Sequence, residues 1–467
     1  MKQKACEFST ESCNNSKKVF MKSSMNKDIA YTMSGQVGRL VFATLASALL
    51  ARGLGTDQRG LYAMAIAGPN LMAMFIPLGQ LQINQTFAGL HKEYRPQLFV
   101  QSFLIALFVS ALCAVSYIAL FRSQATILGN YDQLSFELVY GGAVLLPFLS
   151  FNLLMRELTR GAEFIQSNVV ITTFGFALQA VLTGIFVFGF GVGVLEAMGI
   201  ILVVNFVTII GYCWVFRFYI SEIICRKAKM SREFFKECNR VGVQYLLCSV
   251  VINLDSTLPI FVLGYLGASN ADIGIFAVGF ALAVQMEMVP MSISQVYLPR
   301  LSNGRVGYAA ETPRLFSLTM ISSCFSMLGM LIVGFPLIWL LFGSEYTSSY
   351  YLVSVIVPGI VLASGGRILT SYLRVAKKPR YEITSGLLKV ATFCIFSIVL
   401  YPAMGILGVA MAVTLARLPW ILQLVYAYRK ESGGTFRELS VCKEDFVLLY
   451  RKCMETLPRR TFIGGTK

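Results

Sequence analysis

Residues 194–216 read VLEAMGIILVVNFVTIIGYCWVF, and the segment that follows, 217–240, reads RFYISEIICRKAKMSREFFKECNR. The first stretch has a single charged residue, Glu196, and is long enough to cross a membrane, which takes about 20 mostly apolar residues. The second stretch carries many charges of both signs and belongs in water. The two stretches therefore predict a transmembrane helix over 194–216 followed by a loop in water over 217–240.

The rest of the chain repeats this alternation of long apolar runs and short polar breaks. Hydrophobic residues make up 56% of the sequence and charged residues only 14%, against roughly 25% charged residues in soluble domains. The apolar runs are much longer than the alternating strands of about ten residues that build a membrane barrel. The composition therefore predicts an all-α polytopic membrane protein.

The apolar runs predict about twelve transmembrane helices in two lobes of about six each. They lie near 29–50, 61–82, 97–121, 136–155, 167–190, 194–216, 241–266, 273–298, 316–342, 349–373, 382–401 and 404–428. The corresponding divisions are an N-terminal tail (1–28), a first lobe (29–216), a connecting loop (217–240), a second lobe (241–428) and a C-terminal tail (429–467).

The distribution of Lys and Arg predicts the orientation. About 33 basic residues fall on one side of the predicted helices and about three, Arg52, Arg59 and Arg122, on the other. Both termini and the 217–240 loop are therefore expected in the cytoplasm. The net charge of +16 does not favour a nucleic-acid partner, because the basic residues lie in loops and tails.

A short repeat supports the division into two lobes. Leu54-Gly55 and then Gly60-Leu61-Tyr62-Ala63 follow the first predicted helix, and Leu266-Gly267 and then Gly274-Ile275-Phe276-Ala277 follow the seventh. Since six helices intervene, the two copies have the same orientation, as in a parallel repeat about an axis along the membrane normal. Coincidence is the alternative. Two such lobes around a central cavity form an architecture that alternating-access transporters use.

Ionisable residues inside the predicted spans are the candidate functional residues, because charges in the membrane usually face a cavity or pair with one another. They are Arg39, Asp255, Glu287, Arg367, Lys389 and Arg417. Basic members outnumber acidic ones, which predicts a cavity that attracts anions such as phosphate. Arg39 shares a polar helix face with Thr32, Gln36 and Ser47.

Several of these residues have alternative interpretations. Arg39 could form a structural ion pair with Asp255 or Glu287, and Asp255 could either exchange a proton during transport or serve as a counter-ion. Arg367 and Arg417 could extend to the membrane interface instead of facing a cavity. The prolines of the second helix, Pro69 and Pro77, could act as hinges or be ordinary kinks.

No motif for a cofactor, a metal or a catalytic group occurs. The sequence lacks a Walker A loop, a dinucleotide fingerprint, a serine nucleophile elbow and a zinc motif, and it has one histidine, His91. The eleven cysteines contain no C-x-x-C pair. We therefore expect a protein that is not an enzyme, and transport driven by an ion gradient, the membrane potential or the substrate gradient.

The start of the first lobe resembles a known family. Ser34-Gly35-Gln36, Leu49-Leu50-Ala51-Arg52-Gly53-Leu54-Gly55 and Gly60-Leu61-Tyr62-Ala63-Met64-Ala65 are similar to the opening of bacterial polysaccharide exporters. These are the Wzx-type O-antigen and capsule flippases of the multidrug/oligosaccharidyl-lipid/polysaccharide (MOP) superfamily. Helix number, two lobes, cytoplasmic termini and a basic interior agree along nearly the whole chain.

The resemblance implies a flippase of the bacterial cytoplasmic (inner) membrane that moves an undecaprenyl-pyrophosphate-linked oligosaccharide from the inner to the outer leaflet. It also implies partners such as a polysaccharide polymerase and chain-length machinery. It implies that Arg39, in the first helix, engages the anionic head group or an acidic sugar. Gln36, Lys389, Arg367 and Arg417 are further candidates to line the cavity. Asp255 and Glu287 are candidates for coupling to H⁺ or Na⁺, or for ion pairs.

Three rival functions follow from the same features. A multidrug antiporter of the superfamily would share the fold, but would be expected to have a carboxylate in its first lobe, where this chain has Arg39. A peptidoglycan-precursor flippase would usually have two further C-terminal helices. A polysaccharide polymerase or glycosyltransferase would be expected to have a large outer loop or a nucleotide-sugar domain, and the predicted outer breaks are short.

Overall fold

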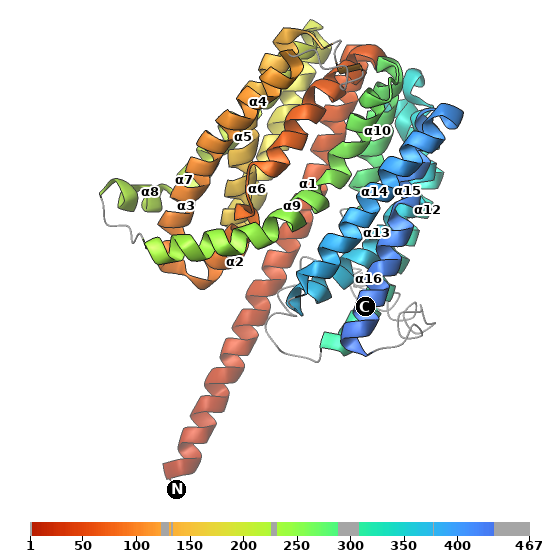
Figure 1. Ribbon diagram of the computed structural model, residues 1–467. Coiled ribbons are helices and arrows are strands. Elements are labelled where there is room, and N and C mark those ends of the chain that lie inside the picture. Colours follow the sequence, from red (N-terminus) through yellow and green to blue (C-terminus); the bar gives the residue numbers. More distant parts are fainter. Residues whose placement is uncertain are drawn as a thin grey trace, which may run out of the picture.

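The computed structural model describes residues 2–122, 130–131, 134–225, 231–287, 308–376 and 378–433, and these form a bundle of helices (Figure 1). The first half contains α1 (Lys2–Phe75), α2 (Gln80–Leu90), η1 (Lys92–Tyr94), α3 (Arg95–Leu104), η2 (Ile105–Val109), α4 (Ser110–Arg122), α5 (Phe136–Gly161), α6 (Ile165–Leu182), η4 (Thr183–Gly189), α7 (Val194–Val215) and α8 (Arg217–Ile224). The second contains α9 (Arg232–Tyr265), α10 (Asn270–Gln285), α12 (Tyr308–Phe342), η5 (Ser344–Tyr346), α13 (Ser349–Val375), α14 (Pro379–Met404), α15 (Ile406–Leu415) and α16 (Arg417–Ser432).

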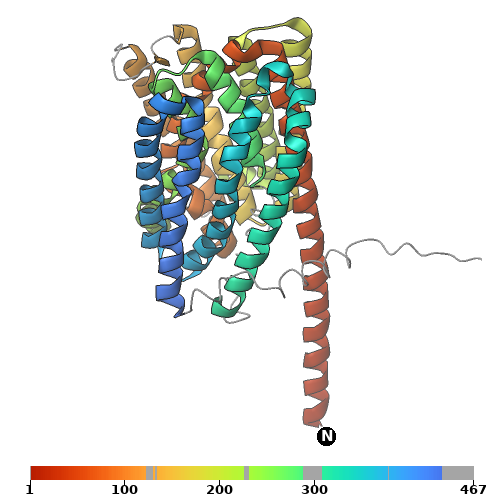
Figure 2. The ribbon, with the colours of Figure 1, turned by 90° about the vertical axis from the view of Figure 1, so that its right-hand side faces the viewer.

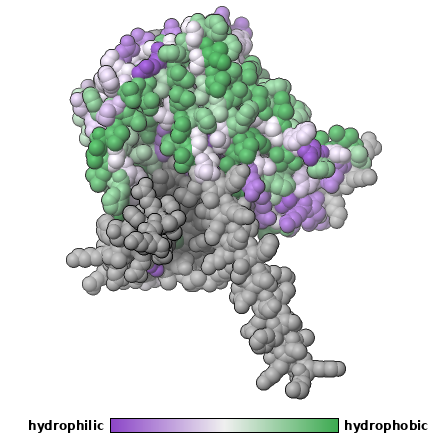
Figure 3. Space-filling model, turned by 180° about the vertical axis from the view of Figure 1, so that it is seen from behind, coloured by the Kyte–Doolittle hydropathy of each residue, from purple (hydrophilic) through white to green (hydrophobic). Residues whose placement is uncertain are grey.

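The helices confirm the predicted all-α polytopic class. Within the described ranges, nine helical stretches are long and apolar enough to cross a membrane. The predicted spans fall largely on helical residues, but the second is interrupted at 76–79, and residues 288–298 of the eighth lie outside the described residues. Apolar side chains dominate the face of the bundle shown in Figure 3, and large ones such as Val115, Phe174 and Ile332 are exposed there or elsewhere on the bundle. This is the surface of a multi-pass membrane protein, because lipid tails cover it.

The first two predicted helices are joined within α1. Gly55 has φ 73° and ψ 178°, which separates two helical stretches at a sharp turn. Glycine tolerates this positive φ because it has no Cβ. The second stretch continues through Pro69 but ends at Phe75, and α2 starts only at Gln80. Pro77 therefore breaks the predicted helix 61–82, since it lacks an N–H and disfavours helical geometry in the preceding residue.

The segment 217–240, expected to be a loop, is helical in its described parts. It contains α8 and the first turns of α9, where the Ser231 hydroxyl accepts a hydrogen bond from the Phe234 N–H at 3.2 Å. Phe234 is buried and its ring stacks on Tyr94 at 4.4 Å between centroids. At the start of α9 the difference is explained by Phe234, which buries this part of the connection against the first half.

We call the two ends of the bundle the Gly55 end and the tail end; the first part of α1 projects from the tail end (Figure 2). At the Gly55 end the halves are joined by hydrogen bonds. The Tyr346 hydroxyl donates to the Ala51 carbonyl at 3.1 Å, and Arg52 donates to the Leu340 carbonyl at 2.6 Å. These bonds link α1 to the last turn of α12 and to η5, so the halves meet at this end.

Two glycines of the sequence repeat, Gly60 and Gly274, contact each other's helix. A Cβ on Gly60 would lie 1.7 Å from the Asn270 carbonyl oxygen, and a Cβ on Gly274 would lie 2.2 Å from the Thr56 carbonyl oxygen. Asn270 lies four positions before Gly274, and Thr56 lies four positions before Gly60. Each glycine therefore approaches the helix turn that ends in the other glycine, and the contact is reciprocal. Reciprocal contacts are what a two-fold axis produces, and they agree with the predicted parallel repeat.

Candidate functional site: two clusters of basic residues

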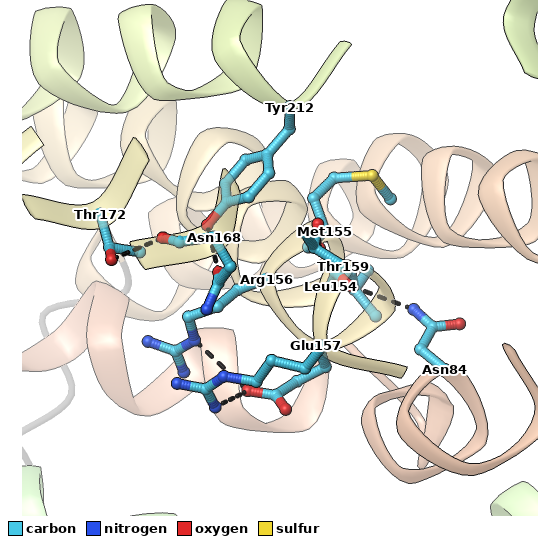
Figure 4. A network of polar contacts seen from close by, with 10 residues as sticks. Asn84, Leu154, Met155, Arg156, Glu157, Thr159, Asn168, Thr172 and Tyr212 are labelled. Atoms are coloured by element: carbon cyan, nitrogen blue, oxygen red, sulfur yellow. Dashed lines mark hydrogen bonds and ion pairs between the residues drawn. The ribbon is translucent and has the colours of Figure 1, made fainter. Parts of the chain in front are cut away.

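The first cluster consists of Arg39 on α1 and Arg156, Glu157 and Arg160 on α5. The Glu157 carboxylate accepts from Arg160 Nη1 at 2.7 Å and from Arg156 Nε at 3.3 Å (Figure 4). Arg39 lies close enough to Arg156 and Arg160 to experience their charge, and its Nε donates to the Gly35 carbonyl at 3.3 Å. The cluster has three guanidinium groups and one carboxylate, which binds Arg156 and Arg160, so it carries an excess of positive charge.

Polar side chains from α6 and α7 border the first cluster. The Tyr212 hydroxyl donates to Asn168 Oδ1 at 3.2 Å (Figure 4). Tyr212 also lies close enough to Arg39 to interact with its charge. Gln36 is buried on α1, almost one turn before Arg39. Thr173 of α6 donates to the Gly35 carbonyl at 3.3 Å, which fixes α1 against α6 beside the cluster.

Sequence reasoning missed Arg156, Glu157 and Arg160 because it ended the fourth helix at 155. The structure extends α5 to Gly161. The signal was present, since two arginines four residues apart flank a glutamate and share one helix face with it. The alternative in which Arg39 forms an ion pair with Glu287 is not realised, and Arg39 makes no ion pair with any residue that the structure describes.

A buried hydrogen-bond network holds α5 in place near the first cluster. The side-chain amide of Asn84 on α2 donates to the Ser102 hydroxyl at 2.8 Å. It also donates to the Leu154 carbonyl at 3.1 Å (Figure 4). Gln80 donates to Asn84 Oδ1 at 3.0 Å. Because Leu154 precedes Arg156 by two residues, this network fixes the part of α5 that carries the arginines.

The second cluster consists of Glu287, Arg367, Arg417, Lys389 and Trp420. Glu287 forms ion pairs with Arg367 and with Arg417, the latter at 3.2 Å between Oε1 and Nη2. Arg417 is only 1% exposed, so its interpretation as a side chain that extends to the membrane interface is wrong. Arg367 is bound to the same carboxylate, which turns it toward Glu287. These pairs join α13 and α16 to the residues just after α10.

Lys389 on α14 completes the second cluster. Its Nζ lies 5.4 Å from the centre of the Trp420 ring, in a cation–π contact. The ring also covers Gly366, where a Cβ would lie 2.3 Å from a ring atom. Among the described residues, the second cluster again has three basic side chains and one carboxylate, which binds Arg367 and Arg417. The side chain of Asp255, the other predicted acidic residue, lies outside the described residues.

The two clusters approach each other along the contact between α1 and α10. The Thr44 hydroxyl donates to Gln285 Oε1 at 2.8 Å. Arg39 precedes Thr44 by five residues, about 7.5 Å along a helix, and Glu287 follows Gln285 by two. Both clusters therefore lie on the tail side of this hydrogen bond, one in each half of the bundle.

Comparison with known proteins identifies the family. The family model described as "Polysaccharide biosynthesis protein" matches residues 25–304, more than half of the chain. The chain belongs to this family. A relative within curated proteins, the capsular polysaccharide biosynthesis protein CapF of Staphylococcus aureus, is 24% identical over 223 residues. That match covers 46% of this chain and 56% of CapF, so it spans little more than half of the relative's length.

Solved structures show the fold of this polysaccharide biosynthesis family member. The lipid II flippase MurJ, in an inward closed conformation, superposes with a TM-score of 0.68 at 15% identity and covers 92% of this chain and 94% of its own. An inward-facing multidrug resistance MATE transporter of the MOP superfamily superposes with a TM-score of 0.66 at 16% identity, covering 87% and 98%. The protein thus has the MATE/MurJ fold.

Proposed function

We propose that the protein is a flippase that carries a lipid-linked oligosaccharide, the repeat unit of an O-antigen, a capsule or a similar glycan, across the cytoplasmic membrane. The observation that carries this proposal is the pair of basic clusters, one in each half, that lie on the same side of the contact between α1 and α10. An undecaprenyl-pyrophosphate head group would meet guanidinium groups from both halves, and Arg binds phosphate oxygens in a bidentate manner.

The proposed direction of transport is from the tail end to the Gly55 end. The excess of basic residues in the predicted loops of the tail end supports a cytoplasmic location for that end and for both termini. Closure of the bundle at the Gly55 end supports entry of substrate from the cytoplasmic side. The lipid tail stays in the bilayer while the sugars and the pyrophosphate pass between the halves.

The proposed coupling uses an ion gradient, with H⁺ or Na⁺ as the ion. Glu287 is engaged by two arginines, which supports a structural role as their counter-ion. Asp255 is then the better candidate for proton exchange. If it has this role, Asp255→Asn removes the dependence of transport in vesicles on the pH gradient. Transport by this variant that still responds to the gradient would place coupling elsewhere.

The experiment that tests the function is complementation of a deletion strain. Without the gene, we expect lipid-linked repeat units to accumulate in the inner leaflet while surface polysaccharide disappears. Arg39→Ala and Arg156→Ala should fail to restore the polysaccharide at a normal protein level, whereas Arg122→Ala, which changes an exposed arginine at the Gly55 end, should restore it. Normal surface glycan in the deletion strain, together with sensitivity to cationic drugs, would indicate a multidrug exporter instead.

A further inference from the structure

Arg59 is a buried cation in the contact between the halves. It was expected in an aqueous loop, but only 8% of its surface is exposed, and this prediction is therefore wrong. Its guanidinium carbon lies 5.2 Å from the centre of the Tyr62 ring. Tyr346 of the second half lies close enough to interact with the Arg59 charge. The position of Arg59, directly before Gly60, places it beside the reciprocal glycine contact.

Arg59 has no carboxylate to balance its charge among the described residues. Its Nε is buried without a hydrogen-bond partner, and no ion pair involves it. The buried Arg417 and the half-buried Arg160 each bind a glutamate. A buried charge that lacks a partner is costly, because it loses its hydration without gaining an opposite charge. Among the residues that the structure describes, the closed Gly55 end therefore offers Arg59 no anion.

Separation of the halves at this end would uncover Arg59. The groups that cover it include Tyr346, whose hydroxyl reaches across to the Ala51 carbonyl. In a transporter that alternates between two states, this contact must part to release substrate to the outside. Arg59 would then face the exit path with all of its N–H donors available, and an anion on that path would be its natural partner.

We propose that Arg59 is an exit-side binding site for the phosphate groups of the transported head group, used after the Gly55 end has opened. This inference rests on the proposed function. The head group would pass from the two basic clusters to Arg59, which binds phosphate oxygens by charge-assisted hydrogen bonds. When the anion leaves, Arg59 returns to the face of Tyr62 and the end closes.

A binding role and a purely structural role for Arg59 make opposite predictions. Arg59→Met removes an unbalanced buried charge, so we expect the purified full-length protein to unfold at an equal or higher temperature. We expect the same variant to lose surface polysaccharide in the complementation assay, whereas Arg59→Lys retains part of it. The matched control is Arg122→Met, which should change neither. A lower unfolding temperature together with normal polysaccharide would overturn the proposal.

Anion binding can be measured directly with inorganic pyrophosphate. Gly274→Leu is expected to hold the Gly55 end open, and calorimetric titration of this variant should show binding that weakens about tenfold or more when Arg59→Met is added. Addition of Arg122→Met should leave the affinity unchanged. Equal affinity with and without Arg59 would refute the exit site. Arg59-dependent binding in a protein that flips no lipid-linked oligosaccharide would instead refute the proposed function and leave the anion site intact.

Discussion

In the second cluster, the negative charge of Glu287 offsets the positive charges of Arg367 and Arg417. Glu287 is the one carboxylate that the described part of this cluster offers to Arg367 and Arg417, and Arg417 is almost completely buried. A buried ion pair adds little to the free energy of unfolding, but removing one partner lowers that free energy strongly. The remaining charges then stay in a medium that hydrates them poorly. Glu287 therefore stabilises the arrangement of α13 and α16.

We expect Glu287→Gln to lower the free energy of unfolding by about 3–5 kcal/mol, because two arginines lose their counter-ion. Thermal unfolding in detergent would show this as a lower midpoint. Inorganic pyrophosphate should raise the midpoint of the variant more than that of the natural protein, since the arginines then accept an external anion.

Glu382→Gln is the matched control for this prediction. Glu382 binds Arg374 through both carboxylate oxygens, but the Arg374 side chain is 43% exposed, so water replaces the lost partner. We expect a smaller loss of stability and no additional protection by pyrophosphate. Equal losses in the two variants would contradict the importance assigned to burial at Glu287.

At the scale of helices, apolar runs were a sufficient signal for most of the fold. Stretches such as 194–216 and 349–373 coincide with α7 and α13, because only a helix satisfies the backbone polar groups of a long apolar segment in lipid. The signal failed where polar residues continue a helix. The last turns of α5 depend on Asn84 of α2, and Glu287 meets an arginine 130 residues further along the chain. Such long-range pairings leave no local pattern.

The anchoring of α5 by α2 leads to a second prediction. Asn84→Ala removes the donor that serves both Ser102 and the Leu154 carbonyl, and each buried group without a partner costs about 1–3 kcal/mol. We expect a lower unfolding midpoint and reduced polysaccharide export, because Arg156 and Arg160 lose their support. Gln85→Ala, at the next and exposed position of α2, should leave both quantities unchanged. A normal midpoint for Asn84→Ala would show that the network contributes little.

The orientation of α8 and α9 can be tested with two cysteines in single-cysteine variants. Cys225 is exposed, whereas Cys238 is fully buried. Burial and, to a smaller extent, Glu237 raise the pKa of the Cys238 thiol to about 12, so it stays protonated and unreactive at pH 8. We expect a membrane-impermeant maleimide to label Cys225 in inverted vesicles but not in intact cells, and Cys238 in neither. Labelling of Cys225 in intact cells would reverse the proposed topology.

For the whole molecule, the approach of Gly60 to Gly274 determines whether the Gly55 end can close. A leucine at 274 would overlap the Thr56 carbonyl, so we expect Gly274→Leu to shift the population toward an open Gly55 end. A cysteine at the buried position Ala51, in a variant without other cysteines, would report this as faster labelling from the outside. Gly329→Leu is the control, because a Cβ there meets open space. Unchanged labelling in Gly274→Leu would show that the contact is not required for closure.

The reciprocal glycine contact also limits how the two halves can vary. Each half supplies one glycine and the carbonyl that the other glycine approaches, so a larger residue on either side prevents the same closure. A chimera that joins residues 1–225 of this protein to the second half of a distant homologue should therefore fold and insert into the membrane. It should export glycan only when the homologue has a glycine at the position that corresponds to Gly274. Among chimeras that keep both glycines, and therefore close at the Gly55 end in the same way, a change in sugar preference could be assigned to one half or the other.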